Sequence, residues 1–130
     1  MKRKDISVVF YGRRFPKPDW RYDLEDRVLE DFFSEFRSDL SPLGIALNHL
    51  KDEEVVLDVK GYGDLLNCVR IRSPKDGIFN LCLGHIIGKS PRRDLFEDIR
   101  RGVNRVAFAP ETIEPEGSDK IVCHNCGCGC

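Results

Sequence analysis

The sequence has no long hydrophobic run, and no stretch approaches the roughly 18 consecutive apolar residues of a membrane span. Only a short apolar run, residues 6–11, follows the basic start, and no small-residue cleavage site appears, so no secretory signal is predicted. Charge of one sign is also lacking, because 21 Lys and Arg stand against 22 Asp and Glu. With net charge −1, no overall field draws the chain to nucleic acid or to an anionic membrane. We therefore expect a cytoplasmic protein whose partners are neither nucleic acids nor membranes.

Recognisable catalytic motifs are lacking as well. Gly61-x-Gly63 has neither the lysine nor the strand–loop–helix context of a phosphate loop. No Ser-His-Asp arrangement and no pair of carboxylates directed at a cleft can be defended from the spacing. We therefore expect a binding or accessory protein rather than an enzyme.

The length and composition indicate one soluble domain followed by a tail. A chain of 130 residues buries roughly two thirds of the surface that it exposes when unfolded. Its 41% hydrophobic and 33% charged residues suit a soluble globular protein, and the somewhat high charged share predicts a highly solvated surface. We expect an α+β globular domain over residues 1–108, an extended linker rich in acidic residues, Pro and Gly over 109–122, and a cysteine-rich tail over 123–130.

The hydrophobic patterns predict about three helices packed on a mixed or antiparallel sheet of about four or five strands. An apolar stripe from Leu24 to Phe36 predicts a helix capped by Asp23. Ser41-Pro42 and Ser90-Pro91 predict two more helix starts, since each pairs a capping residue with proline. Runs rich in β-formers predict strands over residues 6–10, 53–59, 65–72, 78–87 and 106–108.

The most distinctive feature is the crowding of four of the six cysteines into the last eight residues. In a reducing compartment such a group is more typical of metal binding or thiol chemistry than of disulfides. A Cys-x-x-Cys pair can wrap one ion, and Gly127 permits the positive φ angle that such a loop needs. Thiolates favour Zn²⁺, Cu(I) or iron–sulfur clusters. We predict a Zn²⁺ or Cu(I) site whose ligands are Cys123, Cys126, Cys128, Cys130 and His124.

Two local resemblances concern metal binding. The segment Cys123-x-x-Cys126-Gly127 resembles one knuckle of a zinc ribbon, but the second knuckle of that fold has no counterpart. The candidates to complete the shell are Cys128, Cys130 and His124 in the tail, or Cys82 and His85 in the domain. A strand over 78–87 would point the last two to opposite faces unless Gly84 makes a bulge. The spacing Cys123-x-x-Cys126-x-Cys128 also resembles the metal claw of nitrile hydratase alpha subunits, in which three sulfurs and two backbone amides hold iron or cobalt. The rest of the chain does not resemble that family.

A third resemblance leads to a different function. The ending Gly127-Cys128-Gly129-Cys130 after a folded domain is similar to the core of a modified-peptide precursor. That resemblance implies that a maturation enzyme recognises residues 1 to about 110 and converts the cysteines to azoles. Redox exchange through Cys123-x-x-Cys126 is a further alternative.

Basic and aromatic residues alternate in the segment 11–22, which we expect to be a loop. Trp, Tyr and Arg dominate the energetics of protein interfaces. We predict that Arg13, Arg14, Trp20 and Arg21 contact a protein partner, whether a maturation enzyme, a metal acceptor or an inhibited target. The last possibility would make the chain an inhibitor or immunity-type module.

The remaining cysteines and one histidine are given structural roles. Cys68 and Cys82 stand among apolar residues and are predicted to be buried core cysteines. His49 is predicted to stabilise the end of the second helix.

Overall fold

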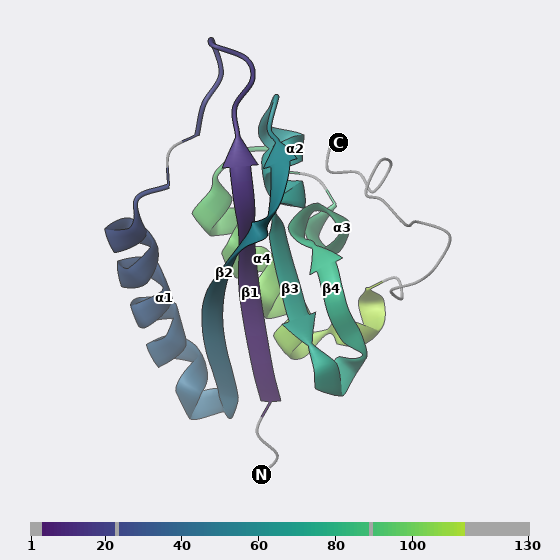
Figure 1. Ribbon diagram of the computed structural model, residues 1–130. Helices are drawn as coiled ribbons and strands as arrows, with labels where there is room; N and C mark the ends of the chain where they lie inside the picture. The colour runs from purple at the N-terminus through teal and green to yellow at the C-terminus, as the bar shows by residue number, and fades with distance from the viewer. Residues whose placement is uncertain (1–3, 23, 89, 114–130) are drawn as a thin grey trace.

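The computed structural model in Figure 1 describes residues 4–22, 24–88 and 90–113. It confirms the predicted α+β fold. The elements in chain order are β1 (Lys4–Arg14), α1 (Asp26–Leu40), the 3-10 turn η1 (Ser41–Leu43), β2 (Ile45–Asp58), α2 (Tyr62–Asn67), β3 (Val69–Ser73), η2 (Pro74–Asp76), β4 (Ile78–Cys82), α3 (Leu83–Ile87), α4 (Leu95–Phe108) and η3 (Pro110–Thr112).

The four strands form one mixed sheet in the order β2-β1-β3-β4. β1 and β2 run parallel, and α1 makes the crossover that a parallel pair requires. β3 is antiparallel to both β1 and β4. α1 lies beside the outer strand β2, where the Arg37 Nε donates to the Leu47 carbonyl oxygen at 2.9 Å.

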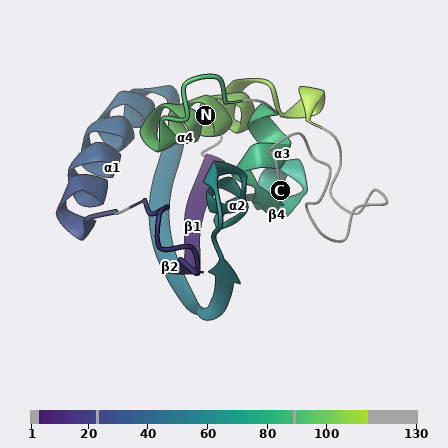
Figure 2. The same cartoon turned by 90° about the horizontal axis from the view of Figure 1, so that it is seen from above.

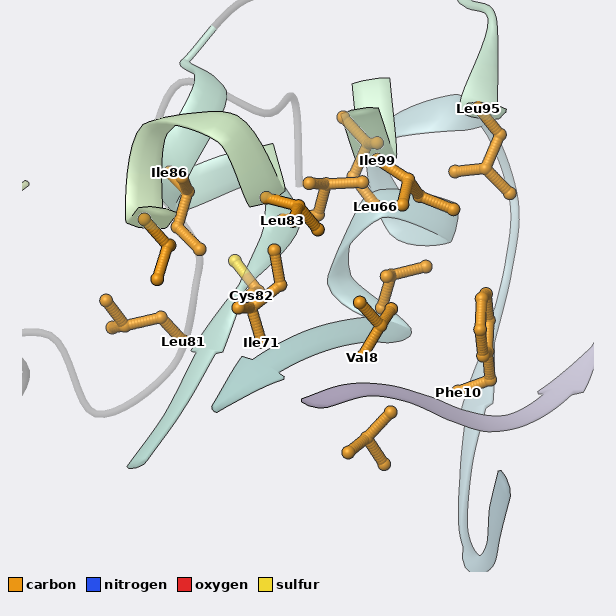
Figure 3. Close-up of a cluster of buried hydrophobic side chains, with 14 of the residues drawn as sticks. Val8, Phe10, Leu66, Ile71, Leu81, Cys82, Leu83, Ile86, Leu95 and Ile99 are labelled. Atoms are coloured by element: carbon orange, nitrogen blue, oxygen red, sulfur yellow. The ribbon is translucent and has the colours of Figure 1, made fainter. Parts of the chain in front are cut away.

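The core lies between the sheet and the helices, and Figure 2 shows α1, α4 and α3 on the same side of the strands. Residues of β1, β3, β4, α2, α3 and α4 contribute to it, as the cluster in Figure 3 shows. Phe33 of α1 is fully buried and meets Phe10 of β1 edge to face, with ring centroids 5.9 Å apart. None of the helices in the described part of the chain is both long and apolar enough to cross a membrane.

The helix predicted from Ser41 is wrong. Ser41 and Pro42 begin only the short turn η1, which ends at Gly44 in the left-handed region at φ 79°. The chain then continues as β2, with Ile45 and Leu47 buried in alternation. A capping residue followed by proline does not distinguish a 3-10 turn from an α-helix, because both begin with the same backbone conformation. His49 therefore lies in a strand rather than at a helix end.

Three predicted strands are wholly or partly helical. Residues 65–67 belong to α2, residues 83–87 form α3, and residues 106–108 are the last turn of α4. Short apolar runs are compatible with a buried strand and with a buried helix, so their periodicity does not decide between them.

Three predicted boundaries also move. β1 continues through Arg14, so the first residues of the predicted loop pair in the sheet. The cap of α1 is Glu25, whereas Asp23 lies outside the described residues. α4 is capped not by Ser90 but by Asp94, whose Oδ1 accepts hydrogen bonds from the backbone N–H groups of two residues in the first turn.

Candidate functional site

An offset in the pairing of β1 with β2 creates the most distinctive feature of the sheet. Tyr11 pairs with Asp52, but the next residue, Gly12, pairs with Val56, so residues 53–55 have no partner in β1. The Glu54 backbone N–H donates to Asp52 Oδ1 at 3.2 Å and helps to fold the extra residues outward. Such bulges redirect side chains and are frequent beside functional sites.

Gly12 permits the strands to close again after the bulge. A Cβ atom at this position would lie 3.0 Å from Val56 Cγ2 and 3.2 Å from the Val55 carbonyl oxygen. Both separations are tighter than ordinary contacts, so a larger residue would push the bulge away.

A cavity of about 390 Å³ lies where the two strands separate. It sits at the carboxyl-terminal halves of two parallel strands and beside the first turn of α1, a common location for ligand sites in sheets with parallel strands. Its volume falls within the range of small-molecule sites, roughly 300–1,000 Å³. The lining residues are Phe10, Tyr11, Gly12, Arg13, Leu29, Lys51, Glu53 and Val56.

The cavity combines two cations with one carboxylate. Lys51 forms an ion pair with Asp26 in the first turn of α1. The hydrogen bond from Lys51 and its charge, with a smaller contribution from Arg13, hold the pKa of Asp26 below its usual value. Arg13 donates to the Tyr11 carbonyl oxygen at 3.3 Å, and Glu53 contributes the carboxylate from the bulge. The opening is thus lined by charges of both signs.

The loop after β1 is organised by its aromatic residues. Phe15 and Trp20 lie with ring centroids 6.1 Å apart, and the Arg21 guanidinium lies over the Phe15 ring at 5.5 Å. The Trp20 backbone N–H donates to the Lys17 carbonyl oxygen at 3.3 Å. Both rings are half-buried against the core, and Figure 1 shows the loop projecting beyond the end of the sheet.

The four predicted partner-binding residues divide into two groups. Trp20 and Arg21 meet around Phe15 in the loop, whereas Arg13 lines the cavity. Arg14 pairs with Asp58 at 2.6 Å on the exposed surface, and this contact raises the pKa of Arg14 and lowers that of Asp58.

Residues from two distant segments complete the cavity and are missing from the sequence-based prediction. Lys51 and Glu53 come from β2, and Leu29 comes from α1. No local motif marks them, because strand pairing brings Lys51 and Glu53 to Arg13 and the packing of α1 brings Leu29.

All of the predicted metal ligands, Cys123, Cys126, Cys128, Cys130 and His124, lie outside the described residues. Within residues 4–22, 24–88 and 90–113, no group of three or more His, Cys, Asp or Glu side chains is arranged to hold a metal ion.

The two cysteines of the folded domain are buried, as predicted. Cys68 is fully buried, and burial raises the pKa of its thiol to about 11. Cys82 lies among Ile71, Leu83 and Ile86 in Figure 3, and burial raises its pKa as well. Both thiols therefore resist ionisation at neutral pH.

The prediction that Cys82 and His85 point to opposite faces of a strand is wrong. Cys82 is the N-cap of α3, and its Sγ accepts a hydrogen bond from the His85 backbone N–H at 3.3 Å. The sulfur thereby helps to start the helix.

Comparison of the chain with protein-family models, with curated proteins and with solved structures gave no match. The function must therefore be argued from the residues and their geometry.

Proposed function

We propose that this protein is a small non-enzymatic accessory protein of the cytoplasm that holds a soft metal ion, Zn²⁺ or Cu(I). The ligands are the thiolates of Cys123, Cys126, Cys128 and Cys130, with His124 as a further donor. The observation that carries the proposal is the density of the thiols, four within eight residues with glycines between them.

The chemistry of the folded domain supports a site confined to the tail. A metal-bound thiol must lose its proton, and burial raises the pKa of both Cys68 and Cys82. The Cys82 sulfur is also engaged at the start of α3. Neither residue is suited to complete a shell begun by the tail.

The loop around Phe15 supports a protein partner. Trp20 and Arg21 are residue types that dominate interface energetics, and the contact of each with the Phe15 ring reduces the conformational entropy lost on binding. We propose that this loop contacts the acceptor of the metal ion.

Elemental analysis and native mass spectrometry of the full chain, purified without air from its own host, test the proposal. We expect Zn or Cu at a constant ratio to protein. Replacement of all four terminal cysteines by serine should abolish binding, whereas Cys68→Ala with Cys82→Ala should leave the ratio unchanged. The proposal would be contradicted if the native protein contains no metal and has an unaltered mass, and if the variant with four serines remains fully active.

The Gly127-Cys128-Gly129-Cys130 ending favours one second candidate, a precursor whose cysteines a maturation enzyme modifies. The same mass measurement separates the two functions. Loss of one water per cyclised cysteine, with loss of two further hydrogens where the azoline is oxidised to an azole, supports the precursor, as does cleavage near Gly117. An unmodified mass that rises on addition of Zn²⁺ or Cu(I) supports the metal site.

A further inference from the structure

We infer that the cavity between β1, β2 and α1 binds a free α-amino acid with a large apolar side chain. The cavity is lined by other residues than the proposed metal ligands, and its proposed ligand does not depend on the metal site. Three observations carry the inference: the volume of the cavity, the apolar part of its lining and the signs of its charged residues.

The volume sets the size of the ligand. About 390 Å³ is near the lower end of the range for small-molecule sites, roughly 300–1,000 Å³, so the cavity suits a small ligand. Phenylalanine and leucine are ligands of this kind.

The apolar lining determines the character of the side chain. Phe10 and Leu29 are each only 2% exposed and belong to the core, so this part of the cavity is preformed. Val56 also lines the cavity and is 52% exposed, so an apolar ligand would cover part of it. Burial of apolar surface then favours an aromatic or branched aliphatic side chain.

The charged lining residues suit a zwitterion. Arg13 and Lys51 can receive a carboxylate, since a guanidinium has five N–H donors and an ammonium has three. Lys51 can keep its contact with Asp26 while it donates to the ligand. The start of α1 lies beside the cavity and also favours the carboxylate. Glu53 can accept from the ammonium group of the ligand.

The same charges disfavour other ligand classes. Arg13 and Lys51 contribute two positive charges to the lining and Glu53 one negative charge. Outside the lining, Asp26 already pairs with Lys51, so a dianion such as a phosphate monoester gains little. A neutral apolar ligand would leave these groups without ionic partners after displacing their water.

Isothermal titration of the full chain with four probes tests the inference. L-phenylalanine contains all three features, whereas 3-phenylpropionate lacks the ammonium group, phenethylamine lacks the carboxylate and glycine lacks the side chain. We expect L-phenylalanine to bind in the millimolar range or tighter, and each incomplete probe to bind about tenfold more weakly or worse, the typical effect of one charged hydrogen bond. Equal binding of 3-phenylpropionate, or no binding of L-phenylalanine at 10 mM or so, would overturn the inference.

Neighbouring residues provide matched controls. Arg13→Gln and Glu53→Gln should weaken L-phenylalanine binding about tenfold, because each removes a charged contact. Arg14→Gln and Glu54→Gln change the adjacent residues, which do not line the cavity, and should leave the affinity within about twofold.

A cavity-filling pair tests the shape independently. Val56→Phe should occupy the apolar space and abolish binding, whereas Val55→Phe, at an exposed position outside the lining, should not. Circular dichroism confirms that each variant is folded. The inference would be refuted, even if Val56→Phe does not fold, by one result. That result is that Arg13→Gln weakens binding no more than Arg14→Gln, and Glu53→Gln no more than Glu54→Gln.

Discussion

Replacing Asp98 by alanine is expected to destabilise the protein by about 4 kcal/mol, because this carboxylate is buried and joins three parts of the fold. Asp98 lies on α4 and is 2% exposed. Its Oδ2 accepts from the Tyr62 hydroxyl of α2 and from the Ser90 hydroxyl in the segment before α4, each at 2.5 Å. Arg101 donates to Oδ1 at 3.2 Å.

The magnitude follows from the partners that alanine leaves behind. Two hydroxyl groups lose their acceptor, and an unsatisfied buried donor costs about 1–3 kcal/mol. Tyr62 is buried and Ser90 half-buried, so together they contribute about 2–6 kcal/mol, with the smaller share from Ser90. The Arg101 side chain is 42% exposed and can turn to water, so its ion pair adds little. Tyr62→Phe removes one charge-assisted hydrogen bond and leaves Asp98 with two partners. This change should lower the free energy of unfolding by about 1.5–3 kcal/mol.

Urea unfolding followed by circular dichroism and by fluorescence of Trp20, the single tryptophan, measures these changes. In a double-mutant cycle, Asp98→Ala and Tyr62→Phe should cost about 1 kcal/mol less together than the sum of their separate effects. Asp39→Ala is the control, because this carboxylate is 59% exposed and lies 3.7 Å from Arg100. It should cost less than about 1 kcal/mol. An Asp98→Ala effect as small as that of the control, or an additive cycle, would refute the reasoning.

Three further predictions concern the half-buried His49 and the buried Cys68 and Gly102. His49 stacks on Phe33 with ring centroids 4.5 Å apart, and burial lowers the pKa of His49. As the pH falls, the unfolded chain therefore binds a proton at this residue before the folded chain does. The free energy of unfolding should decrease as the pH drops below about 6.5. His49→Leu should flatten that part of a plot of urea midpoint against pH; an unchanged slope would contradict the assignment. Burial raises the pKa of Cys68 from 9.0 to about 11, so stability should decline with rising pH across that interval, and Cys68→Ala should reduce the decline in chemical denaturation. A Cβ at Gly102 would lie 2.4 Å from Leu83 Cδ1, so Gly102→Val should lower the free energy of unfolding by about 2 kcal/mol; a variant as stable as the parent in urea would show that the core can expand there.

The success of the sequence-based predictions depended on the length of each element. The helices α1 and α4 are long enough to repeat their apolar stripe several times, and Leu95, Ile99 and Val103 are indeed buried on one face. α2 and α3 span only six and five residues, so their apolar residues give no period. Their helical state follows from packing against the sheet, a tertiary effect that a local pattern does not contain.

Most of the β1–β2 cavity could not be predicted, for a different reason. Arg13 stood out within a basic and aromatic segment, but its neighbours Lys51 and Glu53 meet it only because β2 pairs in parallel with β1 and then skips three residues. Shifting that pairing by one residue would turn their side chains to the opposite face and remove the site. The terminal cysteines require no such pairing, since Cys123 and Cys126 are neighbours along the chain in any conformation. The cavity and the cysteine cluster are therefore best tested with separate variants, and a result at one site should leave the other unchanged.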